Sequence, residues 1–183
     1  MSLQDAIYCL SSSTATFKIE KTLMEENHNN CLVCLCGGLG TRLRQSFNGP
    51  KILAPLFIEK IVAIEFIISW AFASKFNQLI FLAGYEGEQV EHYVSRRNLE
   101  WCSVLVEKQP VGTAHAITEF LSFLPHKFFL INGDTIFSKP LNFKKNTQHN
   151  VLFGVKMSDP RRFGTVEVKH SFVSGFSEKK NVK

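Results

Sequence analysis

The sequence lacks a long hydrophobic run and a secretory leader. Its most apolar window, residues 61–74, contains Glu65 and is too short to cross a bilayer. The N-terminus has no charged region followed by an apolar one, so it does not read as a signal peptide. We therefore expect no association with a membrane, and the reducing cytoplasm is the expected location.

A regular cysteine framework is also missing. Five cysteines are an odd number, and their spacing is uneven, which argues against a disulfide-stapled secreted domain. Three of them lie in the run CLVCLC at 31–36, a pattern that suggests a metal site. That run has no second Cys-x-x-Cys and no nearby pair of histidines, so we interpret these cysteines as small core residues of a strand.

Charge of one sign is only slightly in excess. The 183 residues carry a net charge of +5, and Lys and Arg occur in short pairs such as Lys144-Lys145. This excess suits ligands that bear phosphate, and it equally suits an ordinary solvated surface. Without a long basic run we expect no nucleic-acid partner. The 17 Phe residues and a hydrophobic share of 45% are enough for a packed core.

From Cys31 onward, short apolar runs alternate with stretches of helical pattern. The expected strands are 31–36, 78–83, 103–107, 128–132 and 151–157, and the expected helices are 61–74, 86–97 and 113–124. Continuous apolar runs separated by helices indicate a Rossmann-like, doubly wound α/β fold with a mostly parallel sheet covered on both faces. Residues 1–30 differ in composition, and we interpret them as an N-terminal extension of unknown function before a domain over 31–183.

A glycine-rich loop follows the first expected strand. Gly37, Gly38 and Gly40 lack Cβ atoms, so such a loop can bring backbone N–H groups close to phosphate oxygens. The loop matches neither GxxxxGK[ST] nor GxGxxG, which excludes a Walker loop and disfavours an NAD-dependent dehydrogenase. A tight strand-to-helix turn is the alternative interpretation.

Polar and charged residues strengthen the phosphate interpretation. Thr41 adds a hydroxyl to the loop, and Arg42 and Lys51 add positive charge. Gly112-Thr113 and Asp134 are further polar features that follow expected strands. Because ligands of such sheets bind at the carboxyl ends of the strands, we expect these features to meet at one edge.

Several motifs together resemble the sugar-1-phosphate nucleotidyltransferases. They occur in the order that the family requires and cover roughly residues 31–180: GGLGTRL (37–43), PKILAPL (50–56), GYEGEQVEHYV (84–94), PVGTAHAI (110–117), INGDTIF (131–137), RRFGTVEV (161–168) and GFSEKK (175–180). The nearest likeness is to the heptose-1-phosphate or mannose-1-phosphate guanylyltransferases. The chain departs from the family at Cys36, where Ala is usual, at Ile52, where Pro is usual, and at 59–61, where Gly-Lys-Pro is usual.

The resemblance implies transfer of a nucleotidyl group from a nucleoside triphosphate to a sugar 1-phosphate, with release of pyrophosphate. In-line attack on the α-phosphorus needs alignment and neutralised charge more than a protein nucleophile. Arg42 would stabilise the leaving pyrophosphate, Lys51 would hold phosphate near the reacting centre, and Asp134 would bind Mg²⁺. A turn cap is the alternative role of Asp134.

Further binding residues follow from the same resemblance. The implied nucleotide-binding residues are Leu35, Gly37, Gly38, Gly40, Thr41, Glu107, Gly112 and Thr113. The implied sugar-phosphate-binding residues are Gly164, Glu178 and Lys179. Plain surface charge is the alternative for Glu178-Lys179, and a structural role is the expectation for His115.

Glu107 bears on the choice of base. In the family, the residue five before the Gly of the GT pair reads the base edge, and here that residue is Glu107. A carboxylate only accepts hydrogen bonds, and guanine offers two adjacent donors, whereas uracil and thymine offer one donor between two acceptors. Glu107 thus favours GTP, although GTAHAI at 112–117 resembles the uridylyltransferases and keeps UTP as the alternative.

The family fold normally continues past the EK motif at 178–179, where it supplies part of the sugar pocket and a second metal-binding Asp. We therefore expect the C-terminal part of the usual fold to be missing from this chain. Three interpretations stay open: a truncated enzyme, a nucleotide- or sugar-phosphate-binding protein without turnover, and an enzyme completed by another chain. Assembly into a homo-oligomer is likewise left open.

Overall fold

The computed structural model of the chain describes residues 30–56, 61–109, 111–141, 150–156, 158–159 and 163–177. The chain divides into two units, Met1–Asn142 and Phe143–Lys183. The expected N-terminal extension lies outside the described residues, apart from Asn30.

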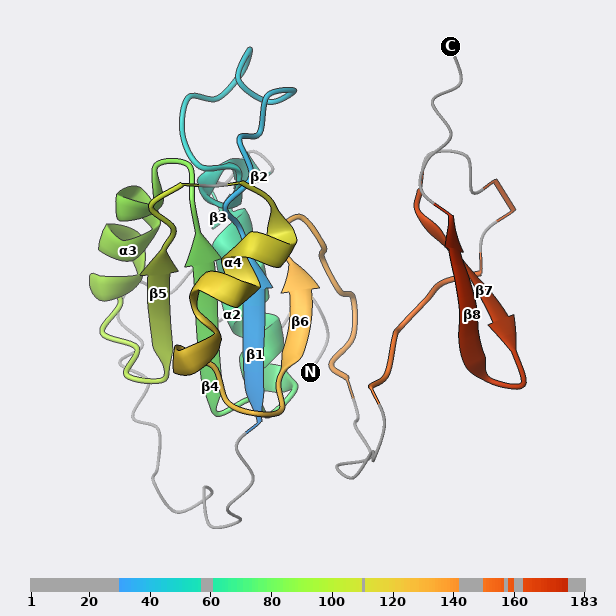
Figure 1. Cartoon of the computed structure of the whole chain (residues 1–183). Coiled ribbons are helices and arrows are strands. Elements are labelled where there is room, and N and C mark those ends of the chain that lie inside the picture. The colour runs from blue at the N-terminus through green and yellow to red at the C-terminus, as the bar shows by residue number, and fades with distance from the viewer. Residues whose placement is uncertain are drawn as a thin grey trace. The chain divides into compact units, whose positions relative to one another are not determined.

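A parallel sheet forms the centre of the first unit (Figure 1). Its strands, in spatial order, are β5 (Cys102–Val106), β4 (Gln78–Ala83), β1 (Cys31–Leu35) and β6 (Phe129–Asn132). All three pairings are parallel, as the apolar runs predicted. The fully buried Cys31 and Cys34 lie within β1 as free thiols, which fits their interpretation as core residues.

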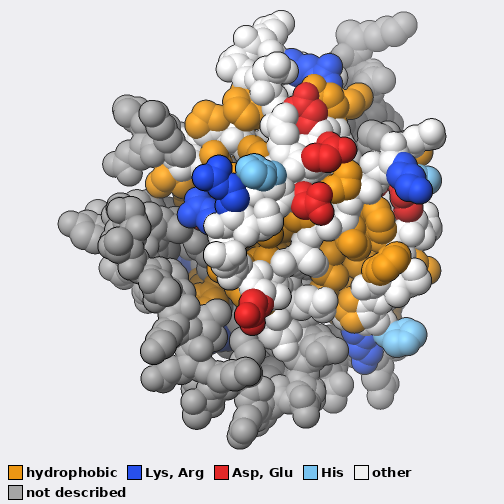
Figure 2. All heavy atoms as spheres, turned by 90° about the vertical axis from the view of Figure 1, so that its left-hand side faces the viewer, with side chains coloured by type: hydrophobic (Ala, Val, Ile, Leu, Met, Phe, Trp, Pro, Cys, Tyr) orange, Lys and Arg blue, Asp and Glu red, His pale blue; other side chains and the backbone are white. Residues whose placement is uncertain are grey.

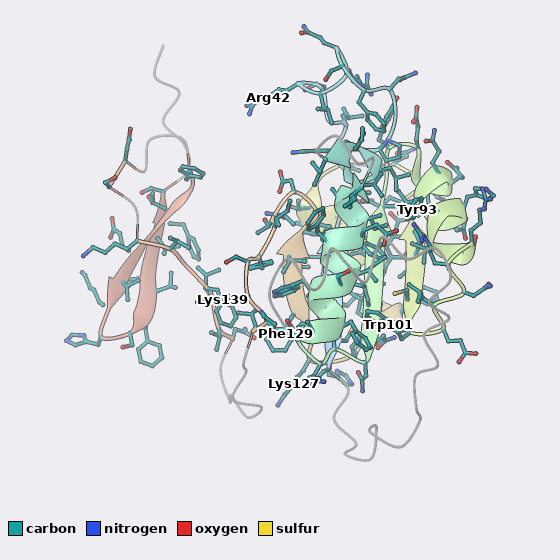
Figure 3. The ribbon with its side chains drawn as sticks, turned by 180° about the vertical axis from the view of Figure 1, so that it is seen from behind. Arg42, Tyr93, Trp101, Lys127, Phe129 and Lys139 are labelled. Atoms are coloured by element: carbon teal, nitrogen blue, oxygen red, sulfur yellow. The ribbon has the colours of Figure 1, made fainter. Side chains whose placement is uncertain are left out.

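Helices cover both faces of this sheet. α2 (Ala63–Ala73) and α3 (Gly87–Ser95) lie on one face, and α4 (Thr113–Glu119) crosses the other (Figures 1 and 3). α2 is apolar around most of its circumference and is buried accordingly, whereas α3 buries Gly87, Val90 and Val94 and exposes most of its polar residues. Under α4, Ala116 packs with Val33 and Leu82 in one apolar cluster.

The strand order creates a crevice beside β1. The chain builds outward from β1 to β4 and β5 through α2 and α3, and then returns to the other side of β1 through α4 to form β6. The connections on either side of β1 therefore leave toward opposite faces of the sheet. Such a topological switch point opens a crevice at the carboxyl ends of the two strands, here after Leu35 and Asn132.

Polar and aromatic contacts connect α3 and the segment after β6 to α2. Glu65, only 8% exposed, accepts a hydrogen bond from Tyr93 and pairs with Arg97 at 2.5 Å, which ties α3 to α2. Trp70 donates a hydrogen bond of 2.8 Å to the Lys139 carbonyl and stacks on Phe137, so the segment after β6 returns to α2. Figure 3 labels Tyr93 on α3 and Lys139 in the segment after β6.

Some element boundaries differ from those expected. Ile61–Val62 forms strand β3, paired antiparallel with β2 (Pro55–Leu56), so the helix expected from 61 begins at Ala63. Two β-branched residues pair readily as a strand, which explains the late start. The helix expected over 113–124 ends at Glu119 and continues after Phe120 as a 3-10 turn, Leu121–Phe123.

The strand expected over 151–157 is wrong for residues 151–156, which have no regular secondary structure. Apolar sequence alone suggested that strand, but a strand also needs a neighbour for its backbone hydrogen bonds. Val151, Leu152 and Val155 are instead exposed, with Val155 at 86%.

A hairpin that the sequence did not predict lies in the second unit. β7 (Thr165–Lys169) pairs antiparallel with β8 (Phe172–Ser177). His170 and Ser171 at its tip have φ of 49° and 67°, the positive values of a type I′ turn. The turn lacks the Asn-Gly or Asp-Gly pair by which such hairpins are recognised.

The face of the first unit that carries β5 and α3 mixes acidic and basic side chains with apolar atoms (Figure 2). Neither sign of charge forms a continuous patch on the described part of this face. Among the described residues, no helix is long and apolar enough to cross a membrane.

Candidate active site

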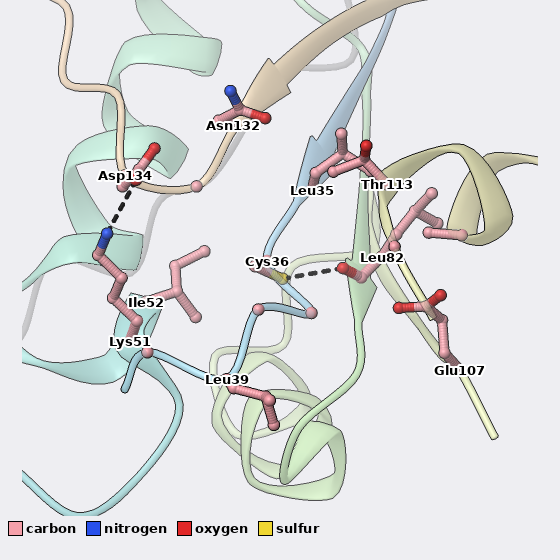
Figure 4. A pocket seen from close by; sticks show the side chains of 16 residues that line it. Leu35, Cys36, Leu39, Lys51, Ile52, Leu82, Glu107, Thr113, Asn132 and Asp134 are labelled. Carbon is pink, nitrogen blue, oxygen red and sulfur yellow. Dashed lines mark hydrogen bonds and ion pairs between the residues drawn. The ribbon is translucent and has the colours of Figure 1, made fainter. Parts of the chain in front are cut away.

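A cavity of about 350 Å³ opens at the carboxyl ends of the parallel strands, where the switch point places it. Its size lies within the range typical of small-molecule sites. The cavity is lined by Leu35, Cys36, Gly37, Gly38, Leu39, Gly40, Lys51, Ile52, Leu82, Glu107, Gly112, Thr113, Ala116, Asn132, Gly133 and Asp134. Most of the nucleotide-binding residues expected from the sequence therefore share one cavity (Figure 4).

The glycine loop, Gly37–Gly40, lies between the two polar ends of the cavity. Cys36 anchors its start, because both the backbone N–H and the thiol donate to the Leu82 carbonyl, at 2.9 and 3.3 Å. The Gly37 carbonyl then accepts from the Tyr85 N–H at 3.2 Å. Gly40 has φ of 57°, a left-handed conformation that favours glycine, and the chain turns there toward the exposed segment 41–46.

Gly37 is a position where the structure requires glycine. A Cβ built there would lie 2.6 Å from Glu107 Oε2 and 3.1 Å from the Gly84 backbone nitrogen. The first distance is well inside van der Waals contact, and the second involves a backbone atom that cannot rotate away. The close approach brings the glycine loop against the carboxylate of Glu107.

Replacing Gly37 with Ala is expected to lower the free energy of unfolding by about 1–3 kcal/mol, the usual effect of overpacking. Gly38→Ala is the matched control, because a Cβ there meets nothing within 4 Å. Urea unfolding followed by Trp fluorescence measures both variants. Equal stability of Gly37→Ala and Gly38→Ala would show that the loop does not pack as described.

An ion pair occupies one end of the cavity. Lys51 Nζ lies 2.8 Å from Asp134 Oδ2, and the two side chains are 49% and 53% exposed (Figure 4). Pro50 precedes the 3-10 turn that begins at Lys51, while Asp134 follows β6 through Gly133. So exposed a pair is worth only about 0–1 kcal/mol, and either group can exchange its partner for a ligand. The pair offers a cation for phosphate oxygens and a carboxylate for a metal ion.

A buried carboxylate occupies the other end. Glu107 directly follows β5, and its backbone N–H donates to the Ala83 carbonyl at 2.7 Å. Its side chain is only 3% exposed, and this burial raises the pKa of Glu107 while the neighbouring His115 opposes the shift. Figure 4 shows Glu107 across the glycine loop from Lys51 and Asp134.

Other expected site residues lie elsewhere. Thr41 and Arg42 are exposed in the turn after the loop and do not line the cavity; Figure 3 shows Arg42 projecting outward. Gly164 belongs to the second unit and is exposed. Glu178 and Lys179 lie outside the described residues.

The structure also adds residues that the sequence did not single out. Asn132 ends β6 and presents an amide to the cavity, and Ile52 contributes an apolar wall. The pattern INGD, a polar pair after a buried run, was a usable signal for Asn132. Ile52 had no such signal, because an apolar residue after Lys51 is equally suited to the core.

The fold and the cavity together define an α/β protein with a glycine-rich loop and a carboxylate at the switch point of its parallel sheet. More particularly, residues 32–182 match the nucleotidyl transferase family, and the chain belongs to that family. The sequence-based prediction of this family, of a transferase class and of its α/β fold is therefore confirmed.

Two bacterial guanylyltransferases are among the proteins that this chain resembles in sequence. The chain is 33% identical over 151 residues to a D-glycero-alpha-D-manno-heptose 1-phosphate guanylyltransferase of Campylobacter jejuni, covering 80% of this chain and 67% of the relative. It is 30% identical over 158 residues to an enzyme of the same name from Aneurinibacillus thermoaerophilus, covering 80% of this chain and 66% of the relative. The chain thus spans about two thirds of the length of these relatives.

A solved structure shares the fold. HddC from Yersinia pseudotuberculosis, crystallised with GMP-PN, superimposes with a TM-score of 0.63 at 27% identity. The match covers 82% of this chain and 69% of HddC.

Proposed function

We propose that this protein transfers a nucleotidyl group from a nucleoside triphosphate, preferably GTP, to a sugar 1-phosphate. The observation that carries the proposal is the single cavity in which the glycine loop, the Lys51–Asp134 pair and the buried Glu107 meet. Their order across the cavity matches the order of a nucleotide, with phosphates at one end and a base at the other. The names of the guanylyltransferase relatives support the same chemistry.

The loop and Lys51 act on the phosphates. Backbone N–H groups of Gly37–Gly40 are available to phosphate oxygens because no side chain shields the glycines. Lys51, once released from Asp134, neutralises charge near the α-phosphorus and positions it for in-line attack. Arg42 projects from the turn after the loop, so its proposed role at the leaving pyrophosphate requires that turn to close over the ligand.

Asp134 is the residue that would hold Mg²⁺. Its half-exposed carboxylate at the cavity fits the ion, which binds through one or two carboxylates and completes its shell with substrate phosphates and water. When bound, Mg²⁺ would supply charge neutralisation on the phosphates. Asp134 meanwhile orients Lys51 in the absence of ligand, through the 2.8 Å ion pair.

Glu107 would recognise the base. Its Oε2 atom, which lies next to Gly37, accepts hydrogen bonds from the two adjacent donors on the guanine edge, which UTP cannot supply. Because Glu107 is buried, leaving its carboxylate without donors costs free energy, and this cost favours a base that supplies them. Since burial also raises the pKa of Glu107, recognition should weaken as acid protonates this group.

Pyrophosphate release tests the proposed reaction directly. The full chain is incubated with Mg²⁺, each common nucleoside triphosphate, and glucose-, mannose-, N-acetylglucosamine- or heptose 1-phosphate. Release with GTP and one of these sugars is the expected result, whereas release with UTP alone would replace guanylyl by uridylyl transfer. Binding of nucleotide by thermal shift without release from any pair would instead favour a binding protein without turnover.

Replacing Glu107 with Gln is expected to shift the preference from GTP toward UTP. The amide both donates and accepts, so it loses one bond to guanine and gains a match to uracil. Loss of a charge-assisted bond predicts a change of about 10- to 100-fold in the ratio of the two dissociation constants. Isothermal titration with both nucleotides measures the ratio. Glu91→Gln, on the exposed side of α3, serves as the control, and an unchanged ratio in Glu107→Gln would refute the role of Glu107.

A further inference from the structure

Three ionisable side chains converge where α4 meets the end of β5. His115 Nδ1 lies 3.5 Å from Glu107 Oε1 and 3.6 Å from Glu119 Oε2. The ligand atoms of all three residues lie within 4.8 Å of one another. His115 and Glu119 are four residues apart on α4, so the helix sets them on one face, while Glu107 reaches the cluster from β5.

Two oxygen atoms of this cluster are buried without a partner. Within the described residues, Glu107 Oε1 and Glu119 Oε2 are inaccessible to solvent and accept no hydrogen bond. The Glu107 side chain as a whole is 97% buried, so bulk water cannot donate the missing hydrogen bond. Leaving a buried acceptor unsatisfied costs about 1–3 kcal/mol, and more when the group is charged. Both oxygens point toward the imidazole nitrogen, which marks the place of a missing positive charge.

A hydrogen bond from His115 does not meet this need. The imidazolium has a single N–H at Nδ1, and one N–H cannot give a good hydrogen bond to two separate carboxylates. Neither oxygen accepts a bond in the observed geometry. A cation placed among all three atoms contacts both oxygens and the nitrogen together.

We propose that Glu107, His115 and Glu119 form a binding site for a divalent transition metal ion of the zinc type. Tetrahedral Zn²⁺ with bonds of 2.0–2.2 Å holds its ligands about 3.4 Å apart, close to the two observed separations. An imidazole with two carboxylates suits Zn²⁺, while Mg²⁺ prefers oxygen alone. His115 is 44% exposed, so the fourth position is open to water.

This metal site is distinct from the Mg²⁺ position proposed at Asp134. It uses the Oε1 atom of Glu107, while the Oε2 atom approaches Gly37 and the cavity. The inference stands on the three side chains; it shares Glu107 with the proposed base recognition, through the other oxygen, and does not depend on the proposed reaction.

The test is titration of the metal-free full chain with Zn²⁺ and with Co²⁺ as a spectroscopic probe, without nucleotide. We expect one high-affinity Zn²⁺ per chain, and Co²⁺ absorption typical of nitrogen and oxygen ligands. His115→Ala and Glu119→Gln should each weaken Zn²⁺ binding, the former by more than about 100-fold, since loss of a ligand exceeds the 10- to 100-fold cost of losing an outer-shell partner. His126→Ala, an exposed histidine that lies away from the cluster, should bind as the unmodified chain does.

Unfolding curves of the metal-free proteins show whether each variant folds. Zn²⁺ should raise the unfolding midpoint of the unmodified chain and of His126→Ala, and should raise that of Glu119→Gln by less at the same Zn²⁺ concentration. Unchanged Zn²⁺ affinity in folded His115→Ala, a thiolate signature in the Co²⁺ spectrum, or no Zn²⁺ binding would overturn the proposal. Because nucleotide is absent, each of these results leaves the proposed transfer reaction untouched.

Discussion

Replacing Asp134 with Asn is expected to lower pyrophosphate release by roughly 10²–10³-fold, the usual cost of removing one group that stabilises charge in a transition state. The amide keeps the shape of the side chain, but it has no charge with which to hold Mg²⁺ against the phosphates. It also frees Lys51, whose Nζ lies 2.8 Å from Asp134 Oδ2. Steady-state kinetics at saturating GTP and sugar 1-phosphate measures the loss.

The fold should survive this substitution. Asp134 is 53% exposed and its ion pair faces solvent, so the free energy of unfolding should change by less than about 1 kcal/mol. Glu91→Gln, an exposed acid-to-amide change on α3, is the matched control and should retain full activity. Activity of a folded Asp134→Asn protein within tenfold of the unmodified chain would remove Asp134 from the reaction.

Replacing Phe81 with Ala is expected to lower the free energy of unfolding by about 3–5 kcal/mol. Phe81 is fully buried in β4, where it faces away from the α4 side because side chains alternate along a strand. Its neighbours in register are Cys34 on β1 and Val104 on β5, so Phe81 lies on an inner strand of the sheet. Removing the ring opens a cavity that these rigid strands cannot close.

Urea unfolding measures this loss through the fluorescence of Trp70 and Trp101, both in the first unit. Phe123→Ala is the control, because that ring is 67% exposed and its removal should cost under about 1 kcal/mol. A loss below about 1 kcal/mol for Phe81→Ala would mean that β4 is not packed at the centre of the sheet.

Much of the first unit was predictable because its signals are local. The apolar runs at 78–83 and 128–132 became β4 and β6 within a residue of the expected bounds. Buried parallel strands must be apolar on both faces, so each appears in the sequence as a continuous apolar run. The segment at 151–156 carried a similar apolar pattern and formed no strand, because strand formation depends on a partner that local sequence does not specify.

The residues of the site likewise fall into those that could be predicted from the sequence and those that could not. The glycine loop and Lys51, which line one cavity, could be predicted as a site because glycines followed by a cation a short distance along the chain suit backbone approach to phosphate. The burial of Glu107 was not recognisable, since it comes from packing between β5, α4 and Gly37. Its position beside His115 and Glu119 was equally hidden, although the spacing from His115 to Glu119 was visible.

The amino-acid sequence therefore determined the family, the glycine-rich loop and the parallel sheet, because each depends on residue types at short, regular spacing. The tertiary structure alone decided which groups meet. Lys51 and Asp134 are separated by 83 positions, yet the switch point beside β1 brings them within 2.8 Å. The same folding buries one oxygen of Glu107 against His115 and Glu119 and turns the other toward Gly37. Contacts of this kind depend on the order and direction of strands far apart in the chain, which no local pattern encodes.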